Sequence, residues 1–446
     1  MTSLQLQPLP TGAGAAGLRP RRRMPQGFHA LIAAQFASAL ADNALLIVTI
    51  ALLVQLSMPG WWAPLLKFGF TLSYVLLAPW VGPLADAFAK ARLMAWMNGV
   101  KIIGVLALLV GLHPVAAFVI VGLGAAAYAP AKYGLITELV EADRLVAANG
   151  WLEVSVVCAA LLGTVLGGLM VSPWLLGLPL LRLVSAEAAV VLGSQAGALV
   201  ASLALLLTVY GLSSLLNLGV PDSGARYPAS SLHPRTLLRN FRAANLTLWR
   251  DADGGLSLAV TTIFWGLAAT LQFAVLRWAA EVLKLPLSQA AYLQAAVAVG
   301  VIVGATAAGR WVRLEQAKRL LWAGVALGLL MPLIACTRQL ALALPLLVLV
   351  GAVGGLMVVP LNALLQHRGH VLLSAGRSVA VQGCNENASV LLMLGSYAGL
   401  LALDLPVVAL MALFGLLIAA AMLGLIWREH GRARASRAAV AGAPPA

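Results

Sequence analysis

The 446-residue chain has few charged residues and very few acidic ones. Charged residues make up 10% of it, against about 25% in soluble domains, and Asp and Glu together number 15. Hydrophobic residues account for 61%, and the mean hydropathy is +0.95. This composition excludes a water-soluble globule and predicts a polytopic helical membrane protein.

The chain also lacks the residue sets of several other protein classes. Its three cysteines, Cys158, Cys336 and Cys384, lie in apolar stretches and form no C-x-x-C pair, which argues against disulfides and a metal site. It contains no phosphate-binding G-x-x-x-x-G-K-[ST] loop and no evident nucleophile–base pair. We therefore expect no enzyme activity, no cofactor and no metal. Most of the 29 Lys and Arg residues are expected on the cytoplasmic side of the membrane, and not on nucleic acid.

What the chain does have is a series of apolar segments, broken by Pro, Gly and charge. They lie near 28–56, 65–84, 92–112, 115–133, 146–170 and 184–212, and then near 255–279, 290–309, 320–337, 341–363, 377–402 and 405–427. With both termini in the cytoplasm, most Lys and Arg fall on the cytoplasmic side. The expected organisation is a basic tail (1–27), a six-helix bundle (28–212), a cytoplasmic connector (213–253), a second six-helix bundle (254–427) and a basic tail (428–446).

The two halves resemble each other. The fourth and tenth segments are glycine-rich helices that close on Pro130 and Pro360. About twenty residues later each half carries an acid within its next helix, Glu153 in the first and Glu386 in the second. Such repeats predict a pseudo-twofold arrangement with the substrate site near the midplane, between the halves.

Several polar side chains interrupt the apolar segments. Burying Asp42 mid-span costs about 2.5 kcal/mol or more, so it should face the interior and have a partner. Lys101 is also mid-span and should pair with an acid inside the bundle. Lys132 ends the fourth segment, where it either attracts an anionic headgroup or snorkels to the interface. Glu153 and Glu386 either act on substrate or belong to a structural polar network.

Arg277 lies late in the seventh segment, four residues before Glu281. This spacing predicts an ion pair on one helical face, near the periplasmic side. The alternative is that the planar guanidinium binds a phosphate.

The loop after the second segment carries Gly82, Asp86, Lys90 and Arg92. It resembles the signature loop of the major facilitator superfamily in both position and spacing. Asp86 can cap a helix start and pair with cations across the bundle, which would hold the cytoplasmic side shut. An ordinary solvated turn is the alternative. The matching loop of the second half has a displaced acid, Glu315, and supports the topology more than a mechanism.

Four longer strings are similar to the bacterial lysophospholipid transporter family within this superfamily: Ala34–Leu46, Gly124–Gly134, Pro360–Gln366 and Gln382–Asn387. The similarity runs from about Phe28 to Trp427. It implies an all-α polytopic membrane protein with the major facilitator fold, in which 12 transmembrane helices form two pseudo-symmetric six-helix bundles. The protein is expected to be a monomer in the bacterial inner membrane.

The resemblance implies import of lysophosphatidylethanolamine and lysophosphatidylglycerol from the outer to the inner leaflet by alternating access. A partner acyltransferase with acyl-carrier-protein synthetase activity then restores the missing chain. The family has an arginine where this chain has Gln272, and Arg277 is a candidate substitute. The expected substrate-binding residues are Asp42, Asn43, Lys132, Tyr133, Glu153, Gln272, Arg277, Asn385 and Glu386, and the expected gate is Gly82, Asp86, Lys90 and Arg92.

Two other functions are compatible with these residues. One is a proton-coupled exporter of drugs or small solutes in which Glu153 and Glu386 titrate. The other is a membrane anchor that moves nothing and recruits a lipid-remodelling enzyme.

Overall fold

The computed structural model describes residues 24–59, 62–179, 181–183, 185, 187, 196–225, 227, 233–285 and 287–441. The helices of the first half are α1 (Phe28–Gln55), α2 (Trp62–Ala87), α3 (Lys90–Leu109), α4 (Pro114–Leu139), α5 (Leu145–Met170), the short α6 (Pro173–Leu176) and α8 (Val200–Leu218). After α9 (Pro234–Arg250), the second half contains α10 (Ala252–Glu281), α11 (Leu287–Trp311), α12 (Leu321–Ala335), α13 (Leu340–Leu372), α14 (Ala375–Ala402) and α15 (Val407–Ala441). Short 3-10 turns, η1 (Ala142–Arg144), η2 (Gly197–Leu199) and η3 (Leu314–Leu320), precede α5, α8 and α12.

Eleven stretches of the described helices are long and apolar enough to cross a membrane. They comprise α1 to α5, α8, α10 to α13 and α15, some with their 3-10 turns. The 28-residue α14 is not among them, because its first half carries Gln382, Asn385, Glu386 and Asn387. At about 1.5 Å per residue it is still long enough to span the bilayer core. Counting α14 with the eleven agrees with the expected twelve.

Some boundaries differ from those expected from composition. The sixth expected segment began at 184, whereas the spanning helix covers Gly197–Leu218. Most of residues 184–196 lie outside the described residues. The expected polar connector contains the 17-residue helix α9. The helix α15 continues through much of the basic tail.

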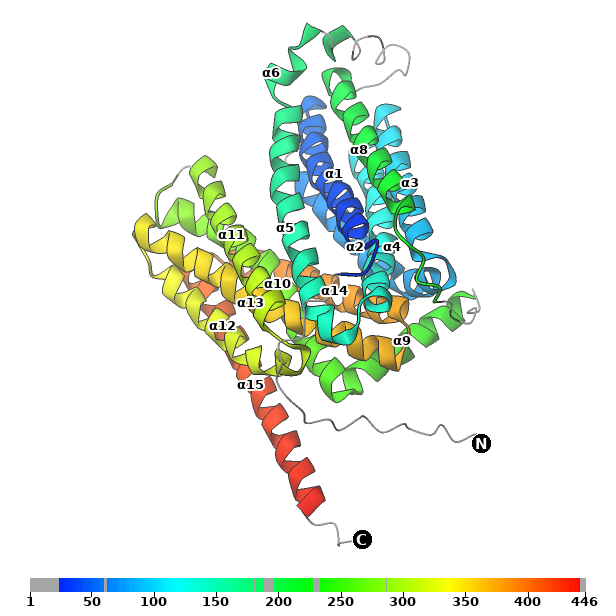
Figure 1. Ribbon diagram of the computed structural model, residues 1–446. Coiled ribbons are helices and arrows are strands. Elements are labelled where there is room, and N and C mark those ends of the chain that lie inside the picture. The colour runs from blue at the N-terminus through cyan, green and yellow to red at the C-terminus, as the bar shows by residue number, and fades with distance from the viewer. Residues whose placement is uncertain are drawn as a thin grey trace.

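The helices form two groups, which Figure 1 shows side by side. In the first, α1 packs on α5 and α8, while α4 packs on α2 and α3. In the second, α11 packs on α13, α12 on α15, and α10 on α14 and α13. The groups meet where α14 lies against α2 and α4, and where α5 lies against α11 and α13. These four contacts are the seam between the halves.

The α11–α13 pair owes its close packing to glycines on both helices. A Cβ at Gly304 would lie 2.0 Å from the Ala352 carbonyl oxygen, and one at Gly351 would lie 2.0 Å from that of Val297. The backbones therefore approach to a distance that excludes any side chain at these positions, as small-residue interfaces in membranes allow.

Replacing Gly304 by Val should lower the stability of the folded protein by about 2 kcal/mol or more, because the added methyl groups force α11 away from α13. The loss should appear as a lower midpoint of thermal unfolding in detergent. Gly168→Val on α5 is the matched control, since a Cβ there meets nothing within 4 Å. Equal midpoints for the two variants would contradict this account of the packing.

Candidate functional site

The seam between the halves is closed at one end by Asp86, at the end of α2. Its Oδ1 accepts the backbone N–H of Gly376 at 2.9 Å, and its Oδ2 accepts the Ser374 hydroxyl. Ser374 and Gly376 are at the first turn of α14, in the other half. The carboxylate therefore caps α14 and meets the positive end of its helix dipole. Arg377 Nε lies 3.9 Å from the same carboxylate, so a cation from the other half also faces Asp86.

Glycines bring α2 and α14 together beside Asp86. A Cβ at Gly82 would lie 3.0 Å from the Arg377 Cα, and one at Gly376 would lie 2.6 Å from the Gly82 carbonyl oxygen. The position of Gly82 in the signature loop thus has a direct physical reason. A side chain here would separate the halves.

Further contacts hold the same end of the seam between α5 and the second half. Asn149 and Gln366 exchange two hydrogen bonds of 2.9 Å, and both side chains are buried. A Cβ at Gly150 would lie 2.9 Å from the Ala305 carbonyl oxygen, so α5 and α11 also touch through backbone. We call this closed end of the seam the Asp86 end.

The other two expected gate residues stay within the first half. Lys90 Nζ lies 2.6 Å from Glu138 Oε1, and their side chains are only 1% and 3% exposed. Ser223 and Tyr227, from the chain that follows α8, both donate to Glu138. Burial and the Glu138 charge raise the pKa of Tyr227, so it remains a donor. Arg92 is exposed and does not join this cluster.

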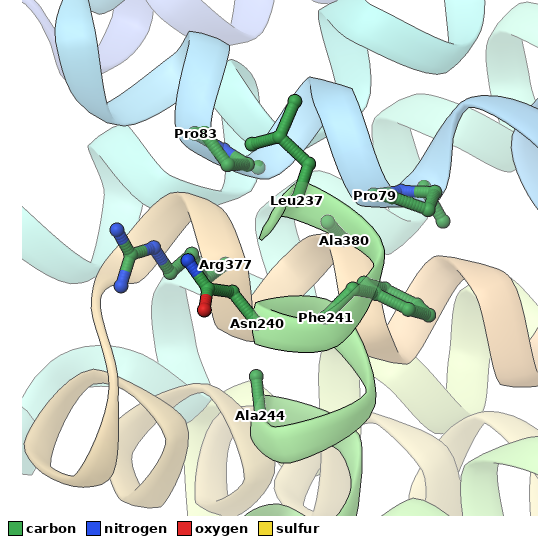
Figure 2. Close-up of a pocket in the computed structure, with 10 residues that line it drawn as sticks. Pro79, Pro83, Leu237, Asn240, Phe241, Ala244, Arg377 and Ala380 are labelled. Atoms are coloured by element: carbon green, nitrogen blue, oxygen red, sulfur yellow. The ribbon is translucent and has the colours of Figure 1, made fainter. Parts of the chain in front are cut away.

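The connector helix α9 lies across the Asp86 end (Figure 1). Figure 2 shows Leu237 and Phe241 of α9 beside Pro79 and Pro83 of α2 and beside Ala380 of α14, around a small pocket. The helix α9 also carries four arginines: Arg235, Arg239, Arg242 and Arg250.

Asn385 contacts α9, not the space between the halves. Its Nδ2 donates to Asn245 Oδ1 at 2.8 Å, and its Oδ1 accepts from Trp249 Nε1 at 3.1 Å. The expectation that Asn385 binds substrate therefore has no geometric support. Its position suits a residue that fastens the connector to α14.

At its other end, α9 leads into Asp251, the N-cap of α10. Asp251 accepts the Gly254 backbone N–H at 2.7 Å and pairs with Arg368 of α13 at 2.6 Å. Burial alone would raise the pKa of Asp251, but the hydrogen bonds from Arg368 and Gly254 outweigh it and lower the pKa. Asp251 is thus held ionised, and α9, α10 and α13 are tied together.

Polar side chains from both halves converge along the seam beyond the Asp86 end. Lys132 and Tyr133 come from α4, Glu153 from α5 and Glu386 from α14. Glu153 interacts electrostatically with Lys132 and with Glu386, and Tyr133 with both acids. Glu153 is buried, whereas the other three are half-buried. Four of the nine expected binding residues are therefore one cluster, which we call the central cluster.

The central cluster includes residues that the sequence had not marked. Gln382 Nε2 donates to Glu386 Oε1 at 2.8 Å and to Asn362 Oδ1 at 2.9 Å, and Thr261 hydrogen-bonds to Glu386. Tyr74 of α2 interacts with Tyr133. Gln382 precedes Glu386 by one helical turn, so that spacing was a usable signal. Thr261 and Tyr74 had none, because their proximity depends on how the halves dock.

Asp42 belongs to a separate, satisfied network in the first half. Its Oδ2 lies 2.7 Å from Lys101 Nζ, and its Oδ1 accepts the Tyr210 hydroxyl at 2.7 Å. Lys101 also donates to Ser38 and lies over the rings of Tyr128 and Tyr210. This pair gives Asp42 the partner it was expected to have, and gives Lys101 the acid it required. Asn43 is occupied with its own helix, donating to the Ala39 carbonyl oxygen.

The Asp42 network borders the central cluster, since Asp42 and Lys101 both act electrostatically on Lys132. The side chain of Asp42 is 17% exposed, so it is less enclosed than Lys101, which is 2% exposed. Asp42 thus supplies negative charge at the edge of the cluster while remaining paired.

Gln272 and Arg277 lie away from the central cluster. Arg277 is about 24 Å along α10 from Thr261, and Gln272 is about 16 Å from it. Arg277 is 41% exposed and pairs with Glu281, as the spacing of four residues predicted. Its role as the missing headgroup cation of the cluster is therefore not supported by the geometry.

Two prolines interrupt the backbone hydrogen bonds of α2 beside the seam. Pro79 and Pro83 have no N–H, so the carbonyls of Val75 and Pro79 lack their usual partners four residues on. The thiol of Cys384 on α14 approaches the Val75 oxygen at 4.0 Å, which gives that carbonyl a weak partner from the other half.

Sequence comparisons agree with this architecture. The sequence model of the Major Facilitator Superfamily matches residues 28–375. The lysophospholipid transporter LplT of Citrobacter koseri is 41% identical over 91% of this chain and 96% of its own length. LplT of Yersinia enterocolitica is 41% identical over 86% of this chain and 90% of its own length.

The chain belongs to the lysophospholipid transporter family of the major facilitator superfamily. Solved structures show the fold of this family more distantly. The fucose transporter FucP in the outward conformation has a TM-score of 0.65 at 14% identity, covering 90% of this chain and 98% of FucP. A bacterial homologue of the iron transporter ferroportin in an outward-facing state has a TM-score of 0.65 at 15% identity, covering 89% and 98%. These likenesses concern the fold alone.

In this family member, Asp86→Asn should weaken the closure, because the neutral amide loses the charge-assisted bonds to the start of α14. Spin labels at Arg92 and Trp311, in a background without the three native cysteines, report the separation of α3 from α11. Both residues are exposed. We expect pulsed electron resonance to show a new population at longer distance in Asp86→Asn.

The matched control is Asp404→Asn, which removes an exposed acid in the turn between α14 and α15, away from the α2–α14 contact. It should leave the distance distribution unchanged. A distribution in Asp86→Asn that equals the wild type would show that Asp86 does not hold the halves together.

Proposed function

We propose that the protein moves lysophospholipids across the bacterial inner membrane, with the headgroup bound at the central cluster. The observation that carries the proposal is that a cation and two acids from opposite halves meet at one point of the seam. Lys132 and Glu153 come from the first half, and Glu386 comes from the second. Charged groups placed inside a membrane bundle and left open to a shared space are typical of a substrate pathway.

The cluster has the charges that a lysophosphatidylethanolamine headgroup needs. Lys132 is the group that would bind the phosphate, while Glu153 and Glu386 would bind the ammonium group. Tyr133 contributes a hydroxyl between the two acids. Lysophosphatidylglycerol, which has no ammonium group, would use the same lysine and donate its hydroxyls to the carboxylates. One acyl chain would follow the apolar helix surfaces into the lipid.

Movement of the headgroup would follow alternating access. The Asp86 end would face the cytoplasm, as the excess of Lys and Arg near that end supports. Opening it requires that Asp86 leave Ser374 and Gly376 and that Asn149 leave Gln366. Residues 28–212 and 254–427 would rock as two bodies joined by the connector, and both tails would lie in the cytoplasm. We propose transport and no catalysis, by a monomer.

The physiological direction would be from the outer to the inner leaflet. A lysolipid delivered there is the substrate that an acyltransferase with acyl-carrier-protein synthetase activity consumes. We propose such an enzyme as the functional partner.

Glu153→Gln and Glu386→Gln should each reduce transport of labelled lysophosphatidylethanolamine about tenfold or more, because each removes a charge that pairs with the headgroup. The measurement is uptake into liposomes that contain only the purified protein. Glu315→Gln is the matched control, since Glu315 is 72% exposed and lies in η3, outside the central cluster. It should transport at the wild-type rate.

The same liposomes separate the other functions. A wild-type protein that moves no lysolipid would act as an anchor and would contradict the proposal. Transport that collapses when a protonophore is added, together with loss in both Gln variants, would instead favour proton coupling through Glu153 and Glu386. Full transport by both variants would remove the central cluster as the site.

A further inference from the structure

The connector helix α9 carries a set of charges that neither the central cluster nor the Asp86 end uses. Arg235, Arg239, Arg242 and Arg250 follow one another at spacings of four, three and eight residues. Since successive residues of a helix are turned by about 100°, these four fall within an arc of about 80°, along about 22 Å of α9. All four side chains are exposed. We call this row of residues the arginine stripe.

The opposite side of α9 is the side that packs on the bundle. Leu237, Ala244 and Leu248 are buried, and they lie about 180° around the helix axis from the middle of the stripe. Ala244 and Leu248 belong to an apolar cluster that includes Leu365 of α13 and Val381 of α14. The arginine stripe is therefore turned away from the protein, and its side chains are not needed to hold α9 in place.

The arginines of the stripe form no ion pair within the part of the chain that the structure describes. The helix α9 contains no Asp or Glu. Asp251, which follows it, pairs with Arg368. Asp253 and Glu429 both pair with Lys318. An excess of Lys and Arg on the cytoplasmic side is expected from topology alone, but topology does not require four unpaired arginines in one row. The stripe is thus a strip of uncompensated positive charge.

The helix α9 lies beside spanning helices, not beyond their ends. Figure 2 shows Leu237 and Phe241 next to Pro79 of α2, and Trp249 donates to Asn385 of α14. Pro79 is about 12 Å from the last residue of α2, and Asn385 is about 15 Å from the first residue of α14. The 26 residues of α2 extend about 39 Å, close to the thickness of a bilayer with its headgroups. Contacts this far inside the helix ends put α9 at the level of the lipid headgroups.

An anionic lipid surface suits both the position and the charge of the stripe. The planar guanidinium group binds phosphate through two parallel hydrogen bonds. Each basic residue on a helix next to the membrane strengthens binding to an anionic leaflet about fivefold. Leu246 is 47% exposed and lies between Arg242 and Arg250 in the same row, where a lipid surface can also accept an apolar side chain. An acidic protein surface would have to displace the headgroups to reach this depth.

We propose that the arginine stripe of α9 binds anionic phospholipids in the leaflet at the Asp86 end, which is the cytoplasmic leaflet in the orientation proposed above. The ligands are two-chain lipids that surround the protein, and not the lysolipid of the central cluster. The other face of α9 contacts both α2 and α14, so the bound lipids hold the connector across the seam.

The test is the binding of a fluorescent two-chain phosphatidylglycerol to the purified full chain in neutral detergent, measured by anisotropy. The triple variant Arg235→Gln, Arg239→Gln, Arg242→Gln should bind it about tenfold or more weakly than the wild type, because it removes three of the four positive charges. Lysine at the same three positions should keep most of the affinity. High salt should lower the wild-type affinity and have little effect on the Gln variant. Phosphatidylcholine with the same label should bind both proteins alike.

The matched control is the triple variant Arg310→Gln, Arg319→Gln, Arg428→Gln, which removes three exposed arginines from α11, η3 and α15. It should bind phosphatidylglycerol with nearly wild-type affinity. Equal losses in the two triple variants, or no loss in either, would show that the stripe is not a lipid site. These measurements do not involve transport, so an absence of transport would bear on the proposed function alone.

A second measurement needs no change to the arginines. A fluorophore on Leu246→Cys, in a background without the native cysteines, should be quenched in liposomes by phosphatidylglycerol that carries a nitroxide near its headgroup. The same label on phosphatidylcholine should quench it less. A fluorophore that neither lipid quenches, and that responds only to added polyglutamate, would assign the stripe to an acidic protein and overturn the proposal.

Discussion

The structure depends on how an apolar bundle accommodates ionised side chains, because each charge within it must be paired or kept in contact with water. Two solutions occur in the first half. Lys90 with Glu138, and Lys101 with Asp42, are closed pairs that stabilise helix contacts. Lys132 instead interacts with Glu153 in a largely half-buried cluster that Glu386 of the other half joins. The distinction between closed pairs and charges left accessible separates residues that build the bundle from those available to a substrate.

The second requirement is that the halves separate without unfolding. Within each half, extensive helix–helix packing, including the apolar cluster of the first half and glycine contacts such as that of Gly304, holds the helices together. Between the halves, the closed end combines an apolar contact of Val81 and Ala127 with Ala380 and a few polar groups, Asp86 with the start of α14 and Asn149 with Gln366. Such hydrogen bonds contribute about 1 kcal/mol each when neutral and about 1.5–3 kcal/mol when one partner is charged, so they can break while the two bundles stay intact.

Much of this organisation could be predicted from the sequence, and the failures have physical causes. The apolar segments and the signature loop indicated the fold and Asp86, and the internal repeat linked Glu153 to Glu386. The partner of Lys101 could not be found, because Asp42 lies on another helix. The contacts of Asn385 with Asn245 and Trp249 could not be predicted, because they depend on where α9 docks. The ion pair of Arg277 with Glu281 was predicted correctly. The distance of Arg277 from the central cluster could be judged only once the extent of α10 and the position of Thr261 in the cluster were known.

The two prolines of α2 have a consequence for how such rocking takes place. A helix that lacks two backbone hydrogen bonds one turn apart bends there at a lower cost in free energy than an intact helix. Pro79 and Pro83 place this more flexible segment between Tyr74 and Asp86, beside the stretch where Gly82 packs directly on α14. The part of α2 from Trp62 to Tyr74 can therefore move while the part next to Asp86 stays in place. In that case α2 bends at its prolines, and the two ends of the seam need not open and close together in one rigid-body movement.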